Sequence, residues 1–372
     1  MKMPLQQVLD MYNADAPLQE AYTIPAAWYL DERVEGLERE HVFGGNWIAV
    51  GRADQIAEPG QFFTVELAGE PLVAVRDTDG ELRSFYNVCR HHAAAVANAA
   101  CGTVQHLRCP YHGWTYGLDG ALKGAPEFAG VSNFDRARNG LVPVRVAAWE
   151  QFVFVALNDA VPSLVDFLGD LPARVAPLSI GKLQFFERRT YTLACNWKVY
   201  VDNYLDGGYH VPHLHKGLNS VLDYKEYRIE NSARYSLQSS PMAASEEHAS
   251  FSATRTGDRA YYYWIYPNFM INIYEGVMDT NLVLPLAPDK CQVQFDFYFA
   301  DAGENRREYN LSSIAVSERV QDEDVDICES VQRGLRSRAY GAGRLSVRRE
   351  AGEHLFHRLL ARDLRAAYPF AP

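Results

Sequence analysis

The chain has 372 residues, of which 48% are hydrophobic and 12% aromatic, and its formal net charge at pH 7 is −11. This length allows a sizeable core and is most simply divided into two domains. The acidic balance argues against nonspecific binding of nucleic acid, which needs a basic surface. Because no apolar run approaches the ~20 residues of a membrane helix, and residues 1–22 lack the pattern of a secretory signal, we expect neither membrane insertion nor secretion.

The number of cysteines indicates the redox conditions of the cellular compartment. The chain contains six cysteines, which are sparse for its length: Cys89, Cys101, Cys109, Cys195, Cys291 and Cys328. Such usage does not favour a disulfide framework and fits a reducing environment. The sequence therefore predicts a cytoplasmic protein.

The first part of the chain predicts a helix and then short strands. Residues 26–43 carry apolar side chains at helical spacing, and Gly44-Gly45 is expected to end that helix. The β-prone runs that follow are 47–50, 62–67, 72–75, 84–88 and 152–156. Asp79-Gly80 and Asp119-Gly120 predict hairpins with type I′ turns. We expect residues 1–43 to be a helical segment that packs on the second domain, and residues 44–157 to form a β-sandwich.

The rest of the chain, residues 158–372, predicts a helix-flanked antiparallel sheet. Three prolines, at 162, 172 and 177, mark the crossing between the domains. The expected strands are 185–193, 261–266, 268–274, 281–286 and 292–299, and the expected helices are 196–209, 310–334 and 350–367. The fold class is therefore α+β.

Two segments of the first domain carry cysteine and histidine as possible metal ligands. They read Cys-Arg-His at 89–91 and, after seventeen residues, Cys-Pro-Tyr-His at 109–112. Zinc modules usually pair Cys with Cys and His with His. The mixed pairs instead favour a Rieske [2Fe–2S] cluster, in which one iron takes two thiolates and the other takes two imidazoles. We assign Cys89 and Cys109 to one iron, and His91 and His112 to the other.

A second group of possible ligands lies in the stretch 202–215, which holds three histidines and two carboxylates. Asn203 and His210 are seven residues apart and share one face of the predicted helix. Pro212 should end that helix, so that a later histidine can turn back toward His210. Residue spacing alone leaves both His213 and His215 open as the partner of His210. Two histidines and one carboxylate on one face of an iron leave positions for dioxygen and substrate.

The carboxylate must come from elsewhere, and the stretch 320–329 offers five acids at helical spacing. Most of them are expected to form a solvated acidic face. The spacing does not choose among Asp322, Glu323 and Asp324.

These motifs resemble those of the Rieske oxygenases, the family of ring-hydroxylating oxygenase α subunits. The run Cys-Pro-Tyr-His-Gly-Trp at 109–114 resembles the second cluster loop of that family, and the likeness extends from about Trp28 onward. The sequence differs from the family at position 92, where it has histidine and the family commonly has arginine. We therefore expect His92 to lie beside the cluster or at the surface. The pattern is most similar to the choline monooxygenase branch in four segments: 202–217, 266–272, 278–286 and 324–334.

The resemblance implies the ligands of a mononuclear iron. The family's His-x4-His spacing matches His210 and His215 and does not match His213. The family's iron-binding aspartate precedes a glutamate by five residues, which points to Asp324, with Glu329 as its marker.

The resemblance also implies an electron path between subunits of a homo-oligomer, which we expect to be a homotrimer. A carboxylate before the first iron histidine connects it to a cluster histidine of the neighbouring subunit. Asp206 fits this role, with His112 of the partner subunit on the other side. Many family members place the acid three residues before the histidine, where this chain has Gly207. Asp206 is four residues before it, on the same face of the predicted helix, and Asp202 is the weaker alternative, with a helix N-terminal charge as its simpler role.

The implied function is that of a terminal oxygenase component, which uses dioxygen and electrons from a separate NAD(P)H-dependent flavin or ferredoxin reductase. The expected substrate is a small quaternary ammonium compound, such as choline or a betaine, that is hydroxylated or N-demethylated. The aromatic run at 261–264 suits such a cation, although strand alternation sends only every second ring to one side. The alternatives are an aromatic-ring hydroxylase acting on an aromatic acid and a Rieske electron-transfer protein without oxygenase activity.

Overall fold

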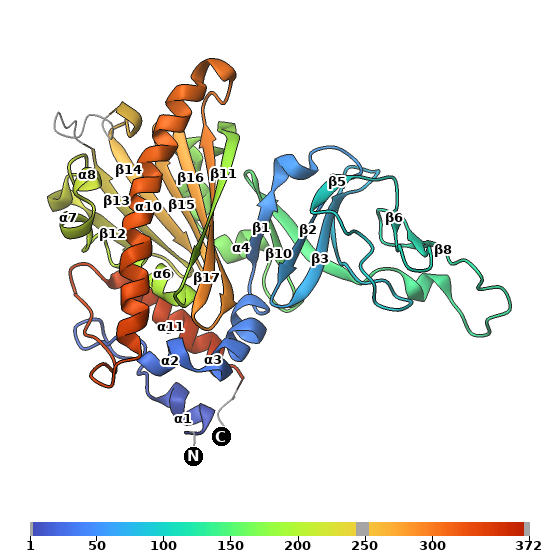
Figure 1. Ribbon diagram of the computed structural model, residues 1–372, viewed down its shortest axis with the longest axis horizontal. Helices are drawn as coiled ribbons and strands as arrows, with labels where there is room; N and C mark the ends of the chain where they lie inside the picture. Colours follow the sequence, from blue (N-terminus) through green and yellow to red (C-terminus); the bar gives the residue numbers. More distant parts are fainter. Residues whose placement is uncertain (1–2, 243–252, 368–372) are drawn as a thin grey trace. The chain divides into compact units, whose positions relative to one another are not determined.

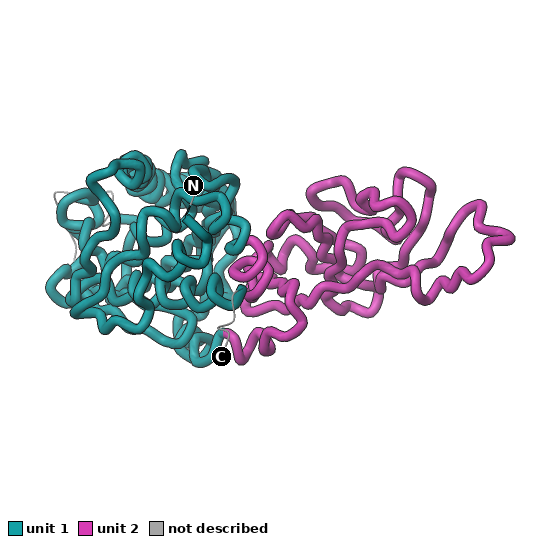
Figure 2. Tube along the Cα trace, turned by 90° about the horizontal axis from the view of Figure 1, so that it is seen from below, with its two compact units in different colours: residues 1–38, 168–372 teal, residues 39–167 magenta. Residues whose placement is uncertain are grey.

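The computed structural model describes residues 3–242 and 253–367, which fold into two compact units. One unit comprises residues 1–38 and 168–372, and the other comprises residues 39–167 (Figure 2). After the sites that the sequence predicts in them, we call the first the catalytic unit and the second the cluster unit. A division of the chain at residues 43 and 157 stays a prediction. Among the described residues no helix is long and apolar enough to cross a membrane.

The cluster unit is built from antiparallel strands (Figure 1). A seven-stranded sheet has the order β1-β10-β9-β4-β3-β2-β5, with bounds Ile48–Arg52, Phe152–Ala156, Pro143–Trp149, Leu82–Tyr86, Glu70–Arg76, Gln61–Leu67 and Cys101–Thr103. A small sheet joins β6, β7 and β8, with bounds Leu107–Arg108, Thr115–Tyr116 and Leu122–Gly124. The unit also contains two short 3-10 helices, Ala53–Ile56 and Arg136–Asn139. All the strands predicted between 47 and 156 are present.

The two predicted type I′ turns are wrong. Such turns need positive φ at both central residues, but only Gly80 (φ 81°) and Gly120 (φ 82°) have it, whereas the aspartates before them do not. At the first turn the Asp77 carboxylate accepts from the backbone N–H groups of residues 79 and 81, at 2.8 and 2.9 Å. This side-chain bonding organises a different turn, with glycine at its one left-handed position.

The catalytic unit is built on a seven-stranded antiparallel sheet in the order β11-β17-β16-β15-β14-β13-β12. The bounds are Gln184–Leu193, Lys290–Phe299, Val277–Ala287, Phe269–Tyr274, Arg259–Ile265, Tyr235–Pro241 and Arg228–Asn231. The sequence analysis did not predict β12 and β13. The reason is that β13 buries polar side chains, among them Ser236, Gln238 and Ser240, so it lacks the apolar alternation by which strands are recognised.

Most helices belong to the catalytic unit, whereas α4 and the π-helix that begins at Glu38 lie almost wholly in the cluster unit. The α-helices are α1 Leu5–Asp10, α2 Ala26–Leu30, α3 Glu32–Leu37, α4 Leu164–Leu168, α5 Leu171–Val175, α6 Trp197–Leu205, α7 Val211–Leu214, α8 Lys216–Asn219, α10 Arg307–Leu335 and α11 Ala351–Arg365. Shorter turns are the π-helix Glu38–Phe43 and the 3-10 helices Ala176–Leu178, Ile180–Lys182, Tyr224–Glu226 and Glu304–Arg306.

The single helix predicted over 26–43 is wrong, because it is broken at Asp31. This residue has extended backbone (φ −88°, ψ 113°), and its carboxylate accepts from Arg33 N at 3.0 Å. An aspartate in this conformation caps the next helix instead of continuing the previous one.

Helix α6 lies at the centre of the catalytic unit and packs against β16, β17, α10 and α11. Its first five residues, 197–201, are all buried, as expected of a helix with packed neighbours on every side. Asn196 caps α6 by accepting from Lys198 N at 3.0 Å. Its amide donates to Pro288 O at 2.7 Å. The long helix α10 runs across the sheet (Figure 1), which brings residues near 324 to residues near 203.

Candidate active site

Both Cys/His segments of the cluster unit close on themselves through the same two backbone hydrogen bonds. In residues 89–94 the first N–H donates to the last carbonyl at 2.8 Å, and the fifth N–H donates to the first carbonyl at 3.0 Å. In residues 109–114 the same two bonds measure 2.8 and 3.1 Å. The fifth residues, Ala93 and Gly113, both have positive φ, 62° and 73°. The two segments are therefore copies of one turn.

The two turns bring the four predicted cluster ligands together. Cys89 and Cys109 are each 2% exposed, and the ring centroids of His91 and His112 lie 4.6 Å apart. The His91 ring stacks on Trp114 with an angle of 3° between the planes. Its Nδ1 is buried and has no hydrogen-bond partner among the described residues. Burial and the neighbouring histidines lower the pKa of His91, which favours the neutral imidazole that binds metals.

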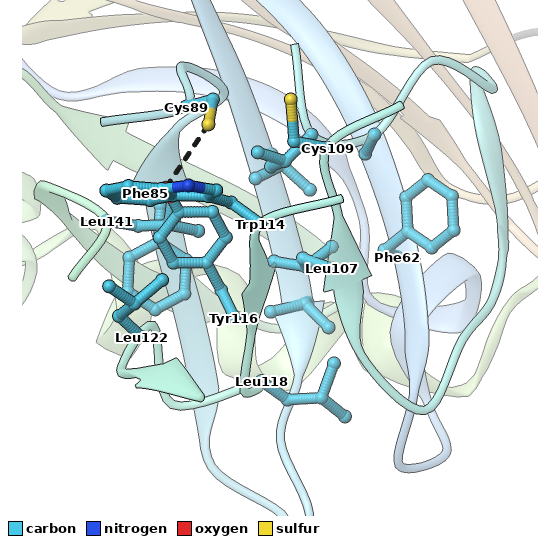
Figure 3. Close-up of a cluster of buried hydrophobic side chains, with 14 residues drawn as sticks. Phe62, Phe85, Cys89, Leu107, Cys109, Trp114, Tyr116, Leu118, Leu122 and Leu141 are labelled. Carbon is cyan, nitrogen blue, oxygen red and sulfur yellow. Dashed lines mark hydrogen bonds between the residues drawn. The ribbon is translucent and has the colours of Figure 1, made fainter. Parts of the chain in front are cut away.

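A hydrophobic cluster lies beneath the two sulfurs (Figure 3). Within it, the hydroxyl of the buried Tyr116 lies 3.3 Å from Cys89 Sγ and accepts from Arg90 N at 3.0 Å. Burial and the contact with Cys89 raise the pKa of Tyr116 well above its usual value, so this hydroxyl keeps a proton to donate to the sulfur. An apolar base with such a donor suits a thiolate-bound iron–sulfur cluster.

The catalytic unit brings His210, His215 and Asp324 together. One ligand atom from each lies within 4.8 Å of the others. His215 Nε2 lies 3.1 Å from Asp324 Oδ1, and His210 Nε2 lies 4.0 Å from the same oxygen. The side chains of His215 and Asp324 are 1% and 13% exposed. Two imidazole nitrogens and one carboxylate oxygen fit a mononuclear iron with open coordination positions.

Each of these three side chains is oriented by a further residue. Asp206 Oδ2 lies 2.6 Å from His210 Nδ1, and Glu323 Oε2 lies 2.6 Å from His215 Nδ1. Asn203 Nδ2 donates to Asp324 Oδ1 at 2.7 Å. Carboxylates that bind the far nitrogen of a metal-binding histidine fix its tautomer and its direction.

The contacts of His215 determine the direction in which its pKa is shifted. Burial lowers the pKa of His215, but the hydrogen bonds and charges of Asp324 and Glu323 outweigh it, and the net pKa is raised. Without a cation, the imidazole therefore compensates the two acids. An iron ion between the three side chains would take over that compensation.

The predicted helix over 196–209 ends early, at Leu205, and Pro212 lies inside α7 instead of ending a helix. Gly207 and Gly208 have φ values of 68° and 67°, and a side chain at Gly207 would collide with the carbonyl oxygen of Arg349. Only glycine fits such a turn.

This turn corrects the expected geometry of Asp206, which is not on one helical face with His210. Its carboxylate instead accepts from the backbone N–H groups of Tyr209 and His210, at 3.1 and 3.0 Å. Asp206 therefore meets His210 through a side-chain-stabilised turn.

The remaining candidates lie away from the three ligands. His213 and Asp322 are exposed. Asp202 lies within α6, so a helix N-terminal charge is the wrong role for it. Its carboxylate accepts from Tyr29 at 2.5 Å and lies 2.9 Å from His357 Nε2.

A cavity of about 120 Å³ opens beside the three ligands and is lined by them. Aromatic side chains form much of its wall: Tyr200, Tyr204, Tyr227, Tyr262, Tyr274 and Phe295. Two buried charged residues, Arg255 and Asp279, also line it. A small ligand in this cavity would meet aromatic faces, both signs of charge and the candidate iron site.

The sequence analysis found only part of this wall. Of the aromatic run at 261–264, only Tyr262 lines the cavity, whereas Trp264 packs on Tyr266 and Phe356 in the core. The other lining rings come from α6, β15, β17 and the segment before β12, so no local motif could have revealed them. The only local signal for Asp279 was its place in the segment 278–286.

Both units match known protein families. Residues 46–135 match the Rieske [2Fe-2S] domain, and residues 180–366 match the catalytic domain of the ring-hydroxylating α subunit. Choline monooxygenase from Arabidopsis thaliana is 41% identical over 97% of this chain and 87% of its own length. The carnitine monooxygenase oxygenase subunit of Escherichia coli is 34% identical over 94% of this chain and 96% of its own length.

The chain belongs to the Rieske oxygenases. Its fold matches the quaternary ammonium Rieske monooxygenase CntA in complex with L-carnitine, with a TM-score of 0.81 and 29% identity, over 97% of this chain and 99% of that one. The predicted α+β fold, a Rieske domain of antiparallel strands followed by a catalytic domain, is confirmed.

As a Rieske oxygenase the protein is an oxidoreductase with two cofactors, a Rieske [2Fe–2S] cluster and a mononuclear iron. The alternative of an electron carrier without oxygenase activity is wrong, because the chain contains the catalytic domain as well. Rieske oxygenases take their electrons from a reductase, which is therefore a partner of this chain.

Proposed function

We propose that this Rieske oxygenase oxidises a small quaternary ammonium compound at a mononuclear iron held by His210, His215 and Asp324. Cys89 and Cys109 bind one iron of the cluster, and His91 and His112 bind the other. Asp206, Glu323 and Asn203 are positioning residues, because each contacts a ligand side chain at 2.6 to 2.7 Å. With dioxygen and reductase electrons, the mononuclear iron supplies the oxidising chemistry.

Asp206 also connects the two cofactors between subunits. It contacts His210 Nδ1, and its own side chain is 16% exposed, so the carboxylate is partly accessible from the surface. On the cluster unit His112 is exposed. The proposed assembly is a homotrimer in which Asp206 accepts a hydrogen bond from His112 of the partner subunit. The reductase is NAD(P)H-dependent, the compartment is the cytoplasm, and the domain boundaries are those predicted at 43 and 157.

A single observation carries the choice of substrate: the cavity beside the iron ligands combines aromatic faces with a buried carboxylate. Asp279 is 3% exposed, and its Oδ2 accepts from Asn272 Nδ2 at 2.7 Å. Asn272 Oδ1 in turn accepts from the Tyr204 hydroxyl at 2.8 Å. Aromatic faces and a carboxylate attract a cation that carries no hydrogen-bond donor, such as a trimethylammonium group. The similarity to oxygenases of choline and of carnitine supports the same choice.

The residues determine what happens to such a cation. Asp279 and the rings hold the charged nitrogen, so that its N-methyl or neighbouring carbon faces the side where His210, His215 and Asp324 converge. Hydroxylation of an N-methyl carbon gives a carbinolamine that releases formaldehyde, whereas hydroxylation at an alcohol carbon gives an aldehyde.

The test is turnover of the purified oxygenase with a surrogate reductase. Choline, glycine betaine, carnitine, proline betaine and simple aromatic acids are supplied in turn, and oxygen uptake and products are measured. We expect oxidation of one or more quaternary ammonium compounds. Product formation from aromatic acids alone would contradict the proposal and favour an aromatic-ring hydroxylase, whose substrate would stack on the same rings.

A further inference from the structure

Arg255 is a buried cation on the wall of the substrate cavity. It is 5% exposed, and its guanidinium carbon lies 4.8 Å from the centroid of the Tyr274 ring. Its two terminal nitrogens donate to the hydroxyls of Ser313 and Ser317, both at 2.5 Å, and to the carbonyls of Ser313 and Thr254, at 3.3 and 3.2 Å. All of these acceptors are neutral, and no carboxylate of the described residues forms an ion pair with Arg255.

Asp279 is the matching buried anion. It lies in the same cavity, and its hydrogen-bond partner among the described residues, the Asn272 amide, is neutral. Burial raises the pKa of Asp279 above its ordinary value, and the positive charge of Arg255 and the hydrogen bond from Asn272 offset part of that rise, so the guanidinium and the carboxylate interact electrostatically. They nevertheless form no ion pair among the described residues, and both line the same cavity.

Two separated and opposite charges in a buried cavity are costly unless something pairs with each of them. A neutral aromatic ligand would pair with neither charge, and choline would pair only with Asp279. A betaine, which carries a quaternary ammonium group and a carboxylate, would pair with both.

The hydroxyl of Ser317 adds a donor on the side of Arg255. Ser317 lines the cavity, and because its oxygen accepts from Arg255, its own O–H can point to another acceptor. The terminal N–H groups of Arg255 already donate to protein oxygens, so Arg255 would attract a carboxylate by its charge and the Ser317 hydroxyl would donate the hydrogen bond.

We propose that Arg255 and Ser317 form a carboxylate-binding subsite, and that the substrates of this oxygenase are betaines rather than choline. This inference rests on the proposed quaternary ammonium oxidation and narrows it to zwitterions. The ammonium group lies against Asp279 and the rings, and the carboxylate lies against Arg255. The competing explanation is that Arg255 only ties the segment 253–256 to α10 through Ser313 and Ser317.

The experiment compares glycine betaine, carnitine and choline with the holoenzyme and surrogate reductase. We expect the wild type to have a higher kcat/KM for at least one betaine than for choline. In Arg255→Gln the ratio of kcat/KM for that betaine to kcat/KM for choline should fall by about 30-fold or more, as expected on loss of a buried charge partner. Arg255→Lys keeps the charge and should restore a large part of the ratio.

A matched control is Arg259→Gln. Arg259 is on β14, donates to Ser239 Oγ at 3.1 Å and does not line the cavity, so the ratio should not change. Equilibrium binding of the betaine to the anaerobic enzyme gives a readout without turnover, and its Kd should rise in Arg255→Gln and not in Arg259→Gln.

Three results would overturn the subsite. Choline could be the better substrate in the wild type, Arg255→Gln could lower kcat/KM for choline and betaine equally, or the Kd for the betaine could stay unchanged. In each case oxidation of choline would leave the proposed function intact. Oxidation of aromatic acids alone would overturn both proposals.

Discussion

The two candidate metal sites of this oxygenase are built in different ways. The cluster site is made of two short turns, each of which supplies one cysteine and one histidine and is closed by its own backbone hydrogen bonds. The mononuclear iron site is assembled from α10 and the segment after α6, more than a hundred residues apart in sequence, and each ligand is held by another side chain. A local site depends on its turns, whereas an assembled site depends on its supporting residues.

The largest expected effect comes from removing a ligand of the assembled site. His210→Ala should abolish oxygenation and leave the visible absorbance of the cluster intact, because the two sites share no residue. His213→Ala, an exposed histidine three positions further on, is the control and should keep its activity. Oxygenation by His210→Ala would mean that the ligand assignment is wrong.

A smaller effect is expected when the proposed connection between the sites is removed. Asp206→Asn keeps the size of the side chain but loses its charge, so both cofactors should stay bound while product formation falls by about 100-fold. Rapid mixing of the reduced enzyme with dioxygen and substrate measures cluster reoxidation. An unchanged single-turnover rate would exclude Asp206 from the electron path.

Changing a residue that supports an iron ligand should have an intermediate effect, here on the affinity for iron. Glu323→Gln weakens the contact with His215 Nδ1, so affinity for iron should fall by about tenfold, as measured by titration of the iron-depleted protein with Fe(II). Asp322→Asn changes the exposed neighbouring acid and should not alter the affinity. Equal losses in both variants would point to the general acidic field of α10 instead.

The smallest effect is expected in the local site. Tyr116→Phe removes the hydroxyl beside Cys89 Sγ, which stabilises the more negative reduced cluster, so the reduction potential should fall while the cluster stays bound. A redox titration checks this, with Tyr86→Phe as a control elsewhere in the same unit. An unchanged potential would show that the hydroxyl does not donate to the sulfur.

The difference between a local site and an assembled site explains what could be predicted from the sequence. The cluster ligands follow from two local motifs, and the long strands and helices follow from periodicity. The break at Asp31 and the end of α6 at Leu205, before the Gly207-Gly208 turn, were missed, because each depends on a cap or on a close approach to distant backbone. Strand β13 was missed because it buries polar residues.

The cavity was the least predictable part of the candidate site. Arg255 and Asp279 are separated along the chain from the histidine motif, and only the tertiary fold brings them to one cavity. The choice of His215 and Asp324 needed the family resemblance, since the spacing alone left rivals. In the fold, His213 and Asp322 are exposed, whereas Glu323 contacts the far nitrogen of His215.

Iron and acid-labile sulfide analysis of three purified proteins tests most directly whether two separate metal sites exist. The wild type should hold about three irons and two sulfides per chain, because a [2Fe–2S] cluster and one mononuclear iron are present together. His215→Ala should lose one iron and no sulfide, and Cys109→Ser should lose both sulfides and keep one iron. A wild type with only two irons, or a His215→Ala protein that also loses its sulfide, would contradict the account.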